Sequence, residues 1–313
     1  MDMAQARFGH RPAMVIPRKL KPGDRIRFVS PASTPDRDEI VARVRILEEL
    51  GFQVDFGAHA FDRNGFLAGT DDDRIDDLNC ALRDPAIRAV FATRGGKGAY
   101  RIADRLDFDA ISRDPKPLVG FSDITILHLM LLRQCGIAGI HGALFGDDDG
   151  GVDLQNRDAL ARMLVETGNM VIASRSDEPT AGLTTRGRAR GVLVGGNLDL
   201  IVTAAGWSLP DMTGAILLLE ASDCYPGRVD RALTMLRKAG HLDGAVGVAV
   251  GQFVMAEPSR GRLIIDIVRG HLEALGVPVL GGLPIGHGKH PVSLPIGTMA
   301  DLDADSGILT TEY

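Results

Sequence analysis

Strand-like apolar runs alternate with helix-like segments over the first half of the chain. The run 26–30 is followed by apolar residues at helical spacing over 36–50, and then by the short apolar run 52–56. Gly51 stands where the helix would end, because glycine readily adopts the left-handed conformation that terminates helices. A strand, a helix and a strand at this spacing form a βαβ unit with a right-handed crossover. The sequence therefore predicts an α/β fold around a parallel sheet.

Three segments follow predicted strands directly and carry residues capable of chemistry. The strand 26–30 ends at Ser30, the buried strand 89–93 runs into the glycine-rich turn 94–98, and the strand 118–121 runs into Ser122. In a doubly wound sheet, ligands bind outside the carboxyl ends of the strands. The sequence therefore predicts that these segments share one edge of the sheet.

The rhythm of the chain changes after the first half, and four regions are predicted. They are an N-terminal arm over 1–17, a doubly wound α/β domain over 18–150, a helix and connector over 151–190, and a second domain over 191–313. In the second domain, the buried apolar run 215–220 ends in an acid, Glu220. Neither an internal repeat nor a low-complexity segment occurs in the sequence.

The composition is that of a soluble globular protein, with 45% hydrophobic and 24% charged residues. A chain of 313 residues can bury a core without disulfide or metal support. The net charge of −6 argues against a broad nucleic-acid surface, which needs a basic stripe. No apolar run approaches the roughly 18 residues of a membrane helix, and no signal peptide is recognisable. The three cysteines, Cys80, Cys135 and Cys224, form no Cys-x-x-Cys motif and are expected to be reduced. These features predict a cytoplasmic protein without nucleic-acid or membrane partners.

The stretch 117–128 contains a candidate nucleophile. An apolar run ends in Gly120-Phe121-Ser122, and a helix-like segment follows at once. A serine at such a turn projects from the edge of the sheet, as in the nucleophile elbow, although Ile124 stands where that motif has its second glycine. The alternative is a helix N-cap, because a serine oxygen accepts hydrogen bonds from the N–H groups of the first turn.

The turn Arg94-Gly95-Gly96-Lys97-Gly98 is a candidate anion site, because its N–H groups precede a helix. It matches neither glycine-rich nucleotide-binding motif, but glycines beside a nucleophile can also supply an N–H to an oxyanion hole. The eight histidines include no His-Glu-x-x-His motif, and Asp147-Asp148-Asp149 lacks the spacing of a calcium loop. We therefore expect neither a metal nor another cofactor.

Four histidines are candidate general bases: His128, His141, His287 and His290. The last two lie in a glycine-bounded loop after an apolar run, and loops on a rigid scaffold commonly hold catalytic groups. Glu220 ends a buried strand, where an unpaired carboxylate would be costly. It can orient an imidazole, or it can form a structural ion pair with Arg228 or Arg231.

Five groups of motifs occur in a characteristic order. They are Arg94-Gly95-Gly96-x-Gly98; Val119-Gly120-Phe121-Ser122-Asp123-Ile124-Thr125; Gly195-Gly196-Asn197-Leu198; Leu219-Glu220 with Asp230-Arg231-x-Leu233; and Gly286-His287 with Leu294-Pro295-Ile296-Gly297. Together they resemble the LD-carboxypeptidases, serine peptidases whose relatives include the microcin C immunity hydrolases. The resemblance runs from about Pro17 to the C-terminus. Two positions depart from the family pattern: Lys97 replaces a usual aromatic residue, and Ala221 replaces a usual acid.

The resemblance implies a flavodoxin-like N-terminal domain and a smaller β-rich C-terminal domain, with the site between them. It implies that Ser122 is the nucleophile, Glu220 the acid and His287 the base of a catalytic triad. The backbone N–H groups of Gly96 and Asp123 would then form the oxyanion hole. Such a site works through an acyl-enzyme and needs no cofactor. The family also suggests a homodimer.

The leading hypothesis is a cytoplasmic LD-carboxypeptidase that releases the terminal D-Ala from muropeptide tetrapeptides during cell-wall recycling. Candidate cations for the substrate carboxylate are Arg94, Lys97, Arg228 and Arg231, each of which has a surface charge or a structural ion pair as its alternative role. One rival is a hydrolase of peptidyl or aminoacyl sulfamoyl-adenylates, as in microcin C immunity. The other is a non-catalytic α/β module that captures a small anion at the glycine turn.

Overall fold

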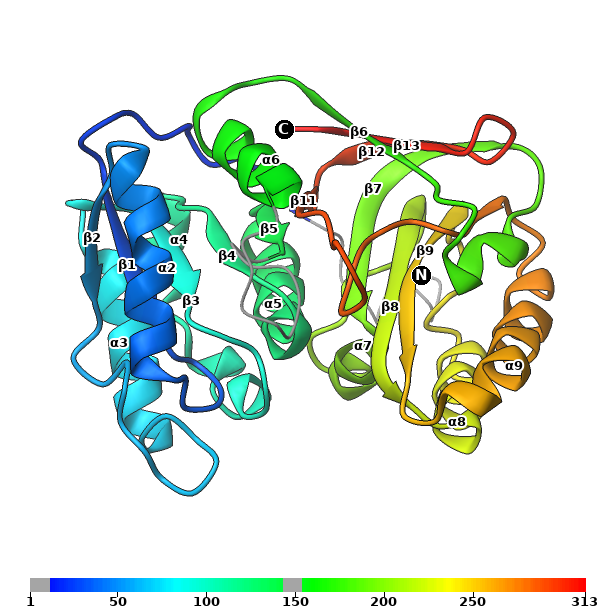
Figure 1. Cartoon of the computed structure of the whole chain (residues 1–313), viewed down its shortest axis with the longest axis horizontal. Coiled ribbons are helices and arrows are strands. Elements are labelled where there is room, and N and C mark those ends of the chain that lie inside the picture. The colour runs from blue at the N-terminus through cyan, green and yellow to red at the C-terminus, as the bar shows by residue number, and fades with distance from the viewer. Residues whose placement is uncertain (1–11, 143–153) are drawn as a thin grey trace, which may run out of the picture.

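The computed structural model describes residues 12–142 and 154–313 (Figure 1). Two sheets lie beside one another, and the blue-to-cyan half of the chain builds the sheet that carries β1 to β4. The Asp147-Asp148-Asp149 run and the predicted boundary at residue 150 lie outside the described residues. Within those residues, none of the helices is long and apolar enough to cross a membrane.

The N-terminal sheet has six strands among the described residues. In spatial order they are β11 (Leu294–Ile296), β5 (Gly139–His141), β4 (Leu118–Gly120), β3 (Ile87–Ala92), β1 (Arg25–Val29) and β2 (Gln53–Phe56). The strands β1 to β5 pair in parallel, whereas β11 comes from the other end of the chain and pairs antiparallel with β5. This order confirms the predicted flavodoxin-like sheet.

Helices cover both faces of this sheet, as a doubly wound fold requires. One face packs against apolar residues of α2 (Arg37–Glu49) and α6 (Leu154–Val165). The other face packs against α3 (Asp71–Arg83), α4 (Phe108–Arg113) and α5 (Thr125–Cys135). The start of α3 is defined by a capping box, in which Thr70 and Asp73 satisfy backbone N–H groups of the first turn.

The C-terminal sheet has seven strands among the described residues. In spatial order they are β10 (Val279–Leu280), β9 (Gly247–Met255), β8 (Ala215–Cys224), β7 (Arg188–Asn197), β12 (Met299–Asp303), β13 (Ile308–Glu312) and β6 (Asn169–Ala173). The strands β7 to β10 pair in parallel, and the remaining pairs are antiparallel. The helices α7 (Leu198–Ala204), α8 (Pro226–Lys238) and α9 (Gly261–Glu273) accompany the parallel part. The predicted sheet-rich C-terminal half is confirmed.

Two segments expected to be an arm and a connector contain ordered contacts. The segment 151–190 contributes β6, which pairs with β13 at the edge of the C-terminal sheet. Only Ile172 of this strand is buried, so its apolar alternation is too weak to reveal it in the sequence. In the segment 12–17, the N–H of Val15 donates to the carbonyl of Gly136 at 2.9 Å, and the N–H of Ala138 donates back to Val15 at 2.9 Å.

The carboxyl ends of β4 and β7 meet where the two sheets approach. The backbone N–H of Asn197, at the end of β7, donates to the hydroxyl of Thr125 at 3.1 Å. A Cβ added at Gly196 would lie 2.7 Å from that hydroxyl oxygen and 3.1 Å from the Cε1 atom of His141. Gly196 also has φ +131°, so both its backbone angle and its close contacts require glycine. The two motifs Val119–Thr125 and Gly195–Leu198 are therefore brought together at this contact.

Replacing Thr125 by valine should weaken the fold at this contact. Valine keeps the shape of the side chain but leaves the buried N–H of Asn197 without its acceptor, which costs about 1–3 kcal/mol of unfolding free energy. Denaturant unfolding of the two proteins measures the difference. Thr203→Val is the matched control, because the exposed Thr203 hydroxyl donates to the Asp199 carbonyl within its own helix. Equal stability losses in the two variants would contradict the assignment.

Candidate active site

Ser122 lies at the turn between β4 and α5 with a backbone φ of +60°. Positive φ is uncommon for a residue with a side chain, so this turn is a strained one. A short 3₁₀ turn, Ser122–Ile124, leads into α5, and within these described residues neither helix start has a side-chain capping bond. The interpretation of Ser122 as an N-cap is therefore wrong, and the strand-turn-helix geometry of an elbow is what the structure has.

The glycine turn packs directly on the side chain of Ser122. A Cβ added at Gly95 would lie 2.7 Å from the Cβ and 3.0 Å from the Oγ of Ser122, so only glycine fits here. The next residue, Gly96, is exposed and has φ +104°. Ser33, which follows β1, accepts the N–H of Lys97 at 3.1 Å. Segments that follow three neighbouring strands thus converge at one edge of the sheet, as predicted.

Glu220 and His287 form a hydrogen-bonded pair in the C-terminal half. Nδ1 of His287 lies 2.7 Å from Oε2 of Glu220, whose side chain is fully buried on β8. A carboxylate can only accept, so the imidazole donates from Nδ1 and its tautomer and orientation are fixed. Gly286, with φ +129°, allows this approach, because a Cβ there would lie 2.9 Å from Oε2. Of the two alternative partners of Glu220, Arg228 pairs with Asp199 instead.

The loop that carries His287 lies against the turn that carries Ser122. The ring of Phe121, which immediately precedes Ser122, is 4.8 Å from the ring of His287 between centroids. A small cavity of about 10 Å³, enough for roughly one water, lies at this junction. Its lining includes Phe121, His141, Gly142, Asn156, Gly286 and Ser293. The neighbours of Ser122 and His287 therefore share one small space between the two sheets.

Sequence reasoning missed Gln252, which holds the loop of the candidate base. This side chain is 2% exposed and lies on β9. Its Oε1 accepts the N–H of Gly288 at 2.8 Å, and its Nε2 donates to the carbonyl of Lys289 at 2.9 Å and to Oε1 of Glu178 at 2.7 Å. A glutamine within the apolar run of β9 was the available signal, because buried amides need hydrogen-bond partners.

The other candidate bases have different surroundings. Burial lowers the pKa of His128 and that of His141 to about 4, so both rings are neutral near pH 7. Nε2 of His128 lies 2.9 Å from the carbonyl oxygen of Gly120, which fits a core histidine. His141 ends β5 and lines the small cavity. His290 is exposed and has φ +48°, in the same loop as His287.

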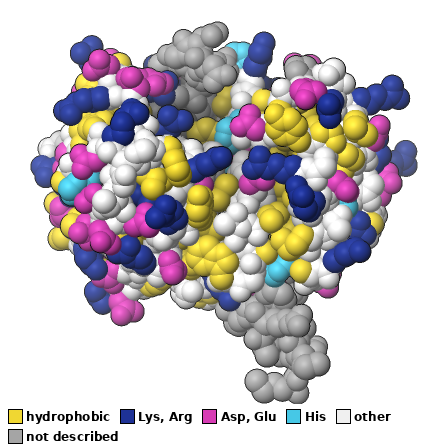
Figure 2. Space-filling model, turned by 90° about the horizontal axis from the view of Figure 1, so that it is seen from below, with side chains coloured by type: hydrophobic (Ala, Val, Ile, Leu, Met, Phe, Trp, Pro, Cys, Tyr) yellow, Lys and Arg dark blue, Asp and Glu magenta, His cyan; other side chains and the backbone are white. Residues whose placement is uncertain are grey.

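The four candidate substrate cations fall into two groups. Arg94 and Lys97 are exposed and flank the glycines beside Ser122. Arg228 and Arg231 lie on α8, and Nε of Arg228 donates to Oδ1 of Asp199 at 2.9 Å. Side chains of both charge signs are interspersed over the face shown in Figure 2, without a broad field of one sign. This distribution agrees with the absence of a basic stripe in the sequence.

Family models match both halves of the chain. Residues 26–142 match the model described as the LD-carboxypeptidase N-terminal domain, and residues 190–302 match that of the LD-carboxypeptidase C-terminal domain. The chain belongs to the LD-carboxypeptidase family. It is accordingly a serine carboxypeptidase, and the family predicted from the five motif groups is confirmed.

Relatives of this LD-carboxypeptidase cover nearly the whole chain. A putative carboxypeptidase of Streptomyces coelicolor is 34% identical over 96% of both chains. A probable murein peptide carboxypeptidase of Bacillus subtilis is 33% identical over 92% of this chain and 91% of its own. Among solved structures, an MccF-like protein from Bacillus anthracis superposes with a TM-score of 0.83 at 23% identity, covering 95% of this chain and 99% of its own. Muramoyltetrapeptide carboxypeptidase from Oxalobacter formigenes superposes with a TM-score of 0.80 at 24% identity, covering 92% and 99%.

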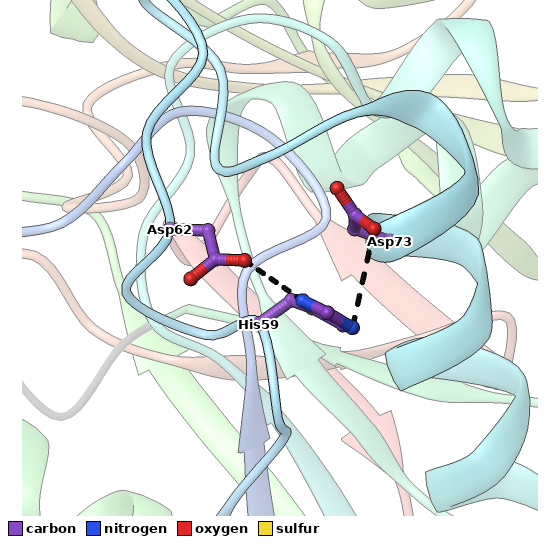
Figure 3. A group of neighbouring side chains, drawn as sticks. All are labelled: His59, Asp62 and Asp73. Atoms are coloured by element: carbon purple, nitrogen blue, oxygen red, sulfur yellow. Dashed lines mark hydrogen bonds and ion pairs between the residues drawn. The ribbon is translucent and has the colours of Figure 1, made fainter.

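One group of side chains in the described residues has ligand types suited to a metal: His59, Asp62 and Asp73. Figure 3 shows the imidazole between the two carboxylates. Nδ1 of His59 lies 2.7 Å from Asp62, whereas Nε2 lies 3.9 Å from Asp73. Because each ring nitrogen faces a different carboxylate, the geometry is that of an imidazolium bridging two acids. The carboxylate of Asp73 also accepts the backbone N–H of Thr70 in the capping box at the start of α3. We therefore assign these residues to an ion-pair bridge between the 57–62 loop and α3.

This bridge should make stability depend on pH. The hydrogen bond to Asp62, followed by the charges of Asp77 and Asp73, raises the pKa of His59 above its usual 6.5. The folded state therefore holds this proton more tightly, so the stabilisation is complete below about pH 6.5 and is lost as pH rises through the raised pKa. The melting-temperature difference between the wild type and His59→Gln should be larger at about pH 6 than at about pH 9. A difference that is independent of pH would contradict the charged bridge.

Proposed function

We propose that this chain is an LD-carboxypeptidase that releases the terminal D-Ala from muropeptide tetrapeptides in cell-wall recycling. The observation that carries the proposal is the 2.7 Å pair of His287 and the buried Glu220, held against the turn that presents Ser122. The murein peptide and muramoyltetrapeptide names of two relatives support the substrate class. A cytoplasmic location and a homodimer belong to the proposal through the family resemblance.

The proposed reaction begins with attack by Oγ of Ser122 on the carbonyl carbon between an L-centre and D-Ala. His287 takes the hydroxyl proton, and Glu220 holds the imidazole in the tautomer that can accept it. The tetrahedral intermediate collapses when the C–N bond breaks, and His287 gives the proton to the departing amine of D-Ala. Water, deprotonated by His287, then hydrolyses the acyl-enzyme and regenerates Ser122. All atoms of this cycle come from the protein, the peptide and water, so no cofactor takes part.

The oxyanion of each tetrahedral intermediate would be bound by the backbone N–H groups of Gly96 and Asp123. Support comes from the glycine turn, which is packed on Ser122 and exposes Gly96 beside it. Arg94 and Lys97 flank the same glycines and are exposed, which suits binding of the D-Ala carboxylate. The ion pair of Arg228 with Asp199 favours a structural role for that arginine. Arg231 is exposed on α8 and is kept as a further candidate.

Two substrates separate the proposed function from its rivals. Purified protein is incubated with a murein tetrapeptide stem and, separately, with an aminoacyl sulfamoyl-adenylate, and the products are identified by mass. Release of D-Ala from the first, with slow or no cleavage of the second, is expected. Cleavage of the adenylate alone would assign the chain to the microcin C immunity kind of hydrolase. Binding without turnover of either substrate would favour the non-catalytic anion-binding module.

Removal of the nucleophile should abolish D-Ala release. We expect Ser122→Ala, and likewise His287→Ala, to lower kcat by about 10⁴-fold or more, because nucleophile and base act as one unit. Release of D-Ala from the tetrapeptide, measured under substrate saturation, tests this. Ser306→Ala is the control, since Ser306 is exposed in the turn between β12 and β13. Near-normal release by pure Ser122→Ala protein would exclude Ser122 as the nucleophile.

A further inference from the structure

The carboxylate of Asp123 links the two segments that would form the oxyanion hole, which are the turn at Ser122 and the glycine turn 94–98. Asp123 directly follows Ser122, and the residue is 1% exposed. Its Oδ2 accepts the backbone N–H of Ala99 at 2.7 Å. Ala99 begins the short 3₁₀ turn that follows Gly98, so this bond ties the end of the glycine turn to the nucleophile turn. Asp123 would therefore contribute its backbone N–H to the oxyanion hole, while its side chain binds the end of the glycine turn.

The glycine turn is held at both of its ends. Ser33 receives the N–H of Lys97 at 3.1 Å and donates its own N–H to the carbonyl of Gly95 at 3.4 Å. Asp123 holds the other end through Ala99. Gly96 lies between the two residues that Ser33 holds, and it has φ +104°, an angle that glycine adopts readily and that these contacts select. Ser33 thus holds the residues on either side of Gly96, and the bond from Ala99 to Asp123 holds the chain just beyond them, so a shift at Ala99 is passed to Gly96 through Gly98 and Lys97.

The surroundings of Asp123 explain how a buried carboxylate persists there. Burial raises the pKa of Asp123 to about 6, while the N–H groups of Ala99 and Gly98 and the charges of Arg74 and Lys97 act in the opposite direction. Arg74, on α3, is itself buried and donates to the carbonyl of Gly98 at 2.9 Å. These cations and N–H groups keep the carboxylate ionised at neutral pH. Protonation would turn one of its two acceptor oxygens into a donor.

We propose that the ionised side chain of Asp123 is a positioning residue, which holds the glycine turn so that the N–H groups of Gly96 and Asp123 converge on one oxyanion. The inference rests on the proposed function of Ser122 and adds a carboxylate to the groups on which that reaction depends. The carboxylate acts through Ala99 and touches neither the substrate nor the attacking oxygen. Its loss should therefore reduce the rate of the chemical step and leave substrate binding nearly intact.

The first test uses Asp123→Asn. An asparagine has a single acceptor oxygen, and its NH₂ group opposes the second N–H of the turn. We expect kcat for D-Ala release to fall about 10- to 100-fold, with KM changed less than about 3-fold, as for a displaced oxyanion donor. Asp84→Asn is the matched control. Its carboxylate accepts the N–H of Ala86 at 2.9 Å at the opposite edge of the sheet. Wild-type kcat in Asp123→Asn, or equal losses in both variants, would overturn the proposal.

The second test reads the pH dependence, and its wild-type measurement does not depend on whether the variant folds. Two protonations, of the base and of Asp123, should each reduce the rate as the pH falls. The acid limb of log kcat/KM in the wild type should then approach a slope of about 2, and in Asp123→Asn a slope of about 1. A purely structural hydrogen bond would leave the slope unchanged by the variant. A wild-type slope of one throughout the acid limb would overturn the proposal.

The third test separates this inference from the choice of substrate. The rate of Ser122 labelling by a fluorophosphonate is measured in both proteins, because phosphonylation needs the same nucleophile and oxyanion site but no muropeptide. Rapid labelling of the wild type and labelling at least about 10-fold slower in Asp123→Asn support the positioning role. Equal labelling rates refute it. Absence of labelling at Ser122 in the wild type would refute the proposed nucleophile itself, and the positioning role with it.

Discussion

The hydrogen bond from Asn197 to Thr125 sets the distance between the two halves of the candidate site. Thr125 begins the helix that follows Ser122, and Asn197 is paired in register with Glu220 on the next strand. The chain of contacts from nucleophile turn to acid is therefore short and consists of backbone and small side chains. Gly196 makes the approach possible, because any Cβ there would overlap Thr125. Ser122 and Glu220, almost 100 positions apart in the sequence, are thus linked through the rigid ends of strands.

Two buried carboxylates, Glu220 and Asp123, supply negative charge at the site, and each is stabilised by specific partners. Glu220 is paired with His287, and Asp123 is surrounded by N–H groups and by Arg74. The pKa of Asp123 is raised, so the folded state binds its proton more tightly than the unfolded chain does. Ionising this group therefore costs folding free energy as the pH rises from about 4 to about 6. Such a cost at a functional site fits a group retained for the position of the glycine turn rather than for stability.

Local pattern located the strands β1 to β4 and the glycine turn, because each depends on a short segment with a distinct period or turn residue, whereas it does not predict β5 and leaves the N-cap alternative open at Ser122. The motif resemblance added Glu220 and His287, whose pairing depends on two segments 67 residues apart. Gln252 and β6 were missed for different physical reasons. The amide of Gln252 is explained only by the loop folded over it, and β6 is an edge strand with one buried residue. The place of β11 in the N-terminal sheet, far from its neighbours in sequence, likewise follows from tertiary packing.

The departure of this elbow from the common motif also has a structural reason. A second glycine after the nucleophile serves close packing of helix against strand, and here Ile124 occupies that position. The space for the Ile124 side chain is left by Gly120 on β4. A Cβ added at Gly120 would lie 2.9 Å from two carbons of the isoleucine side chain. Gly120, the first glycine of the motif, is therefore required for this packing, and Ile124 is fully buried against it. Position 123 is variable in the motif, and here it carries a buried carboxylate that accepts the N–H of Ala99, so one turn can offer both a backbone N–H and an anchor for the glycine turn.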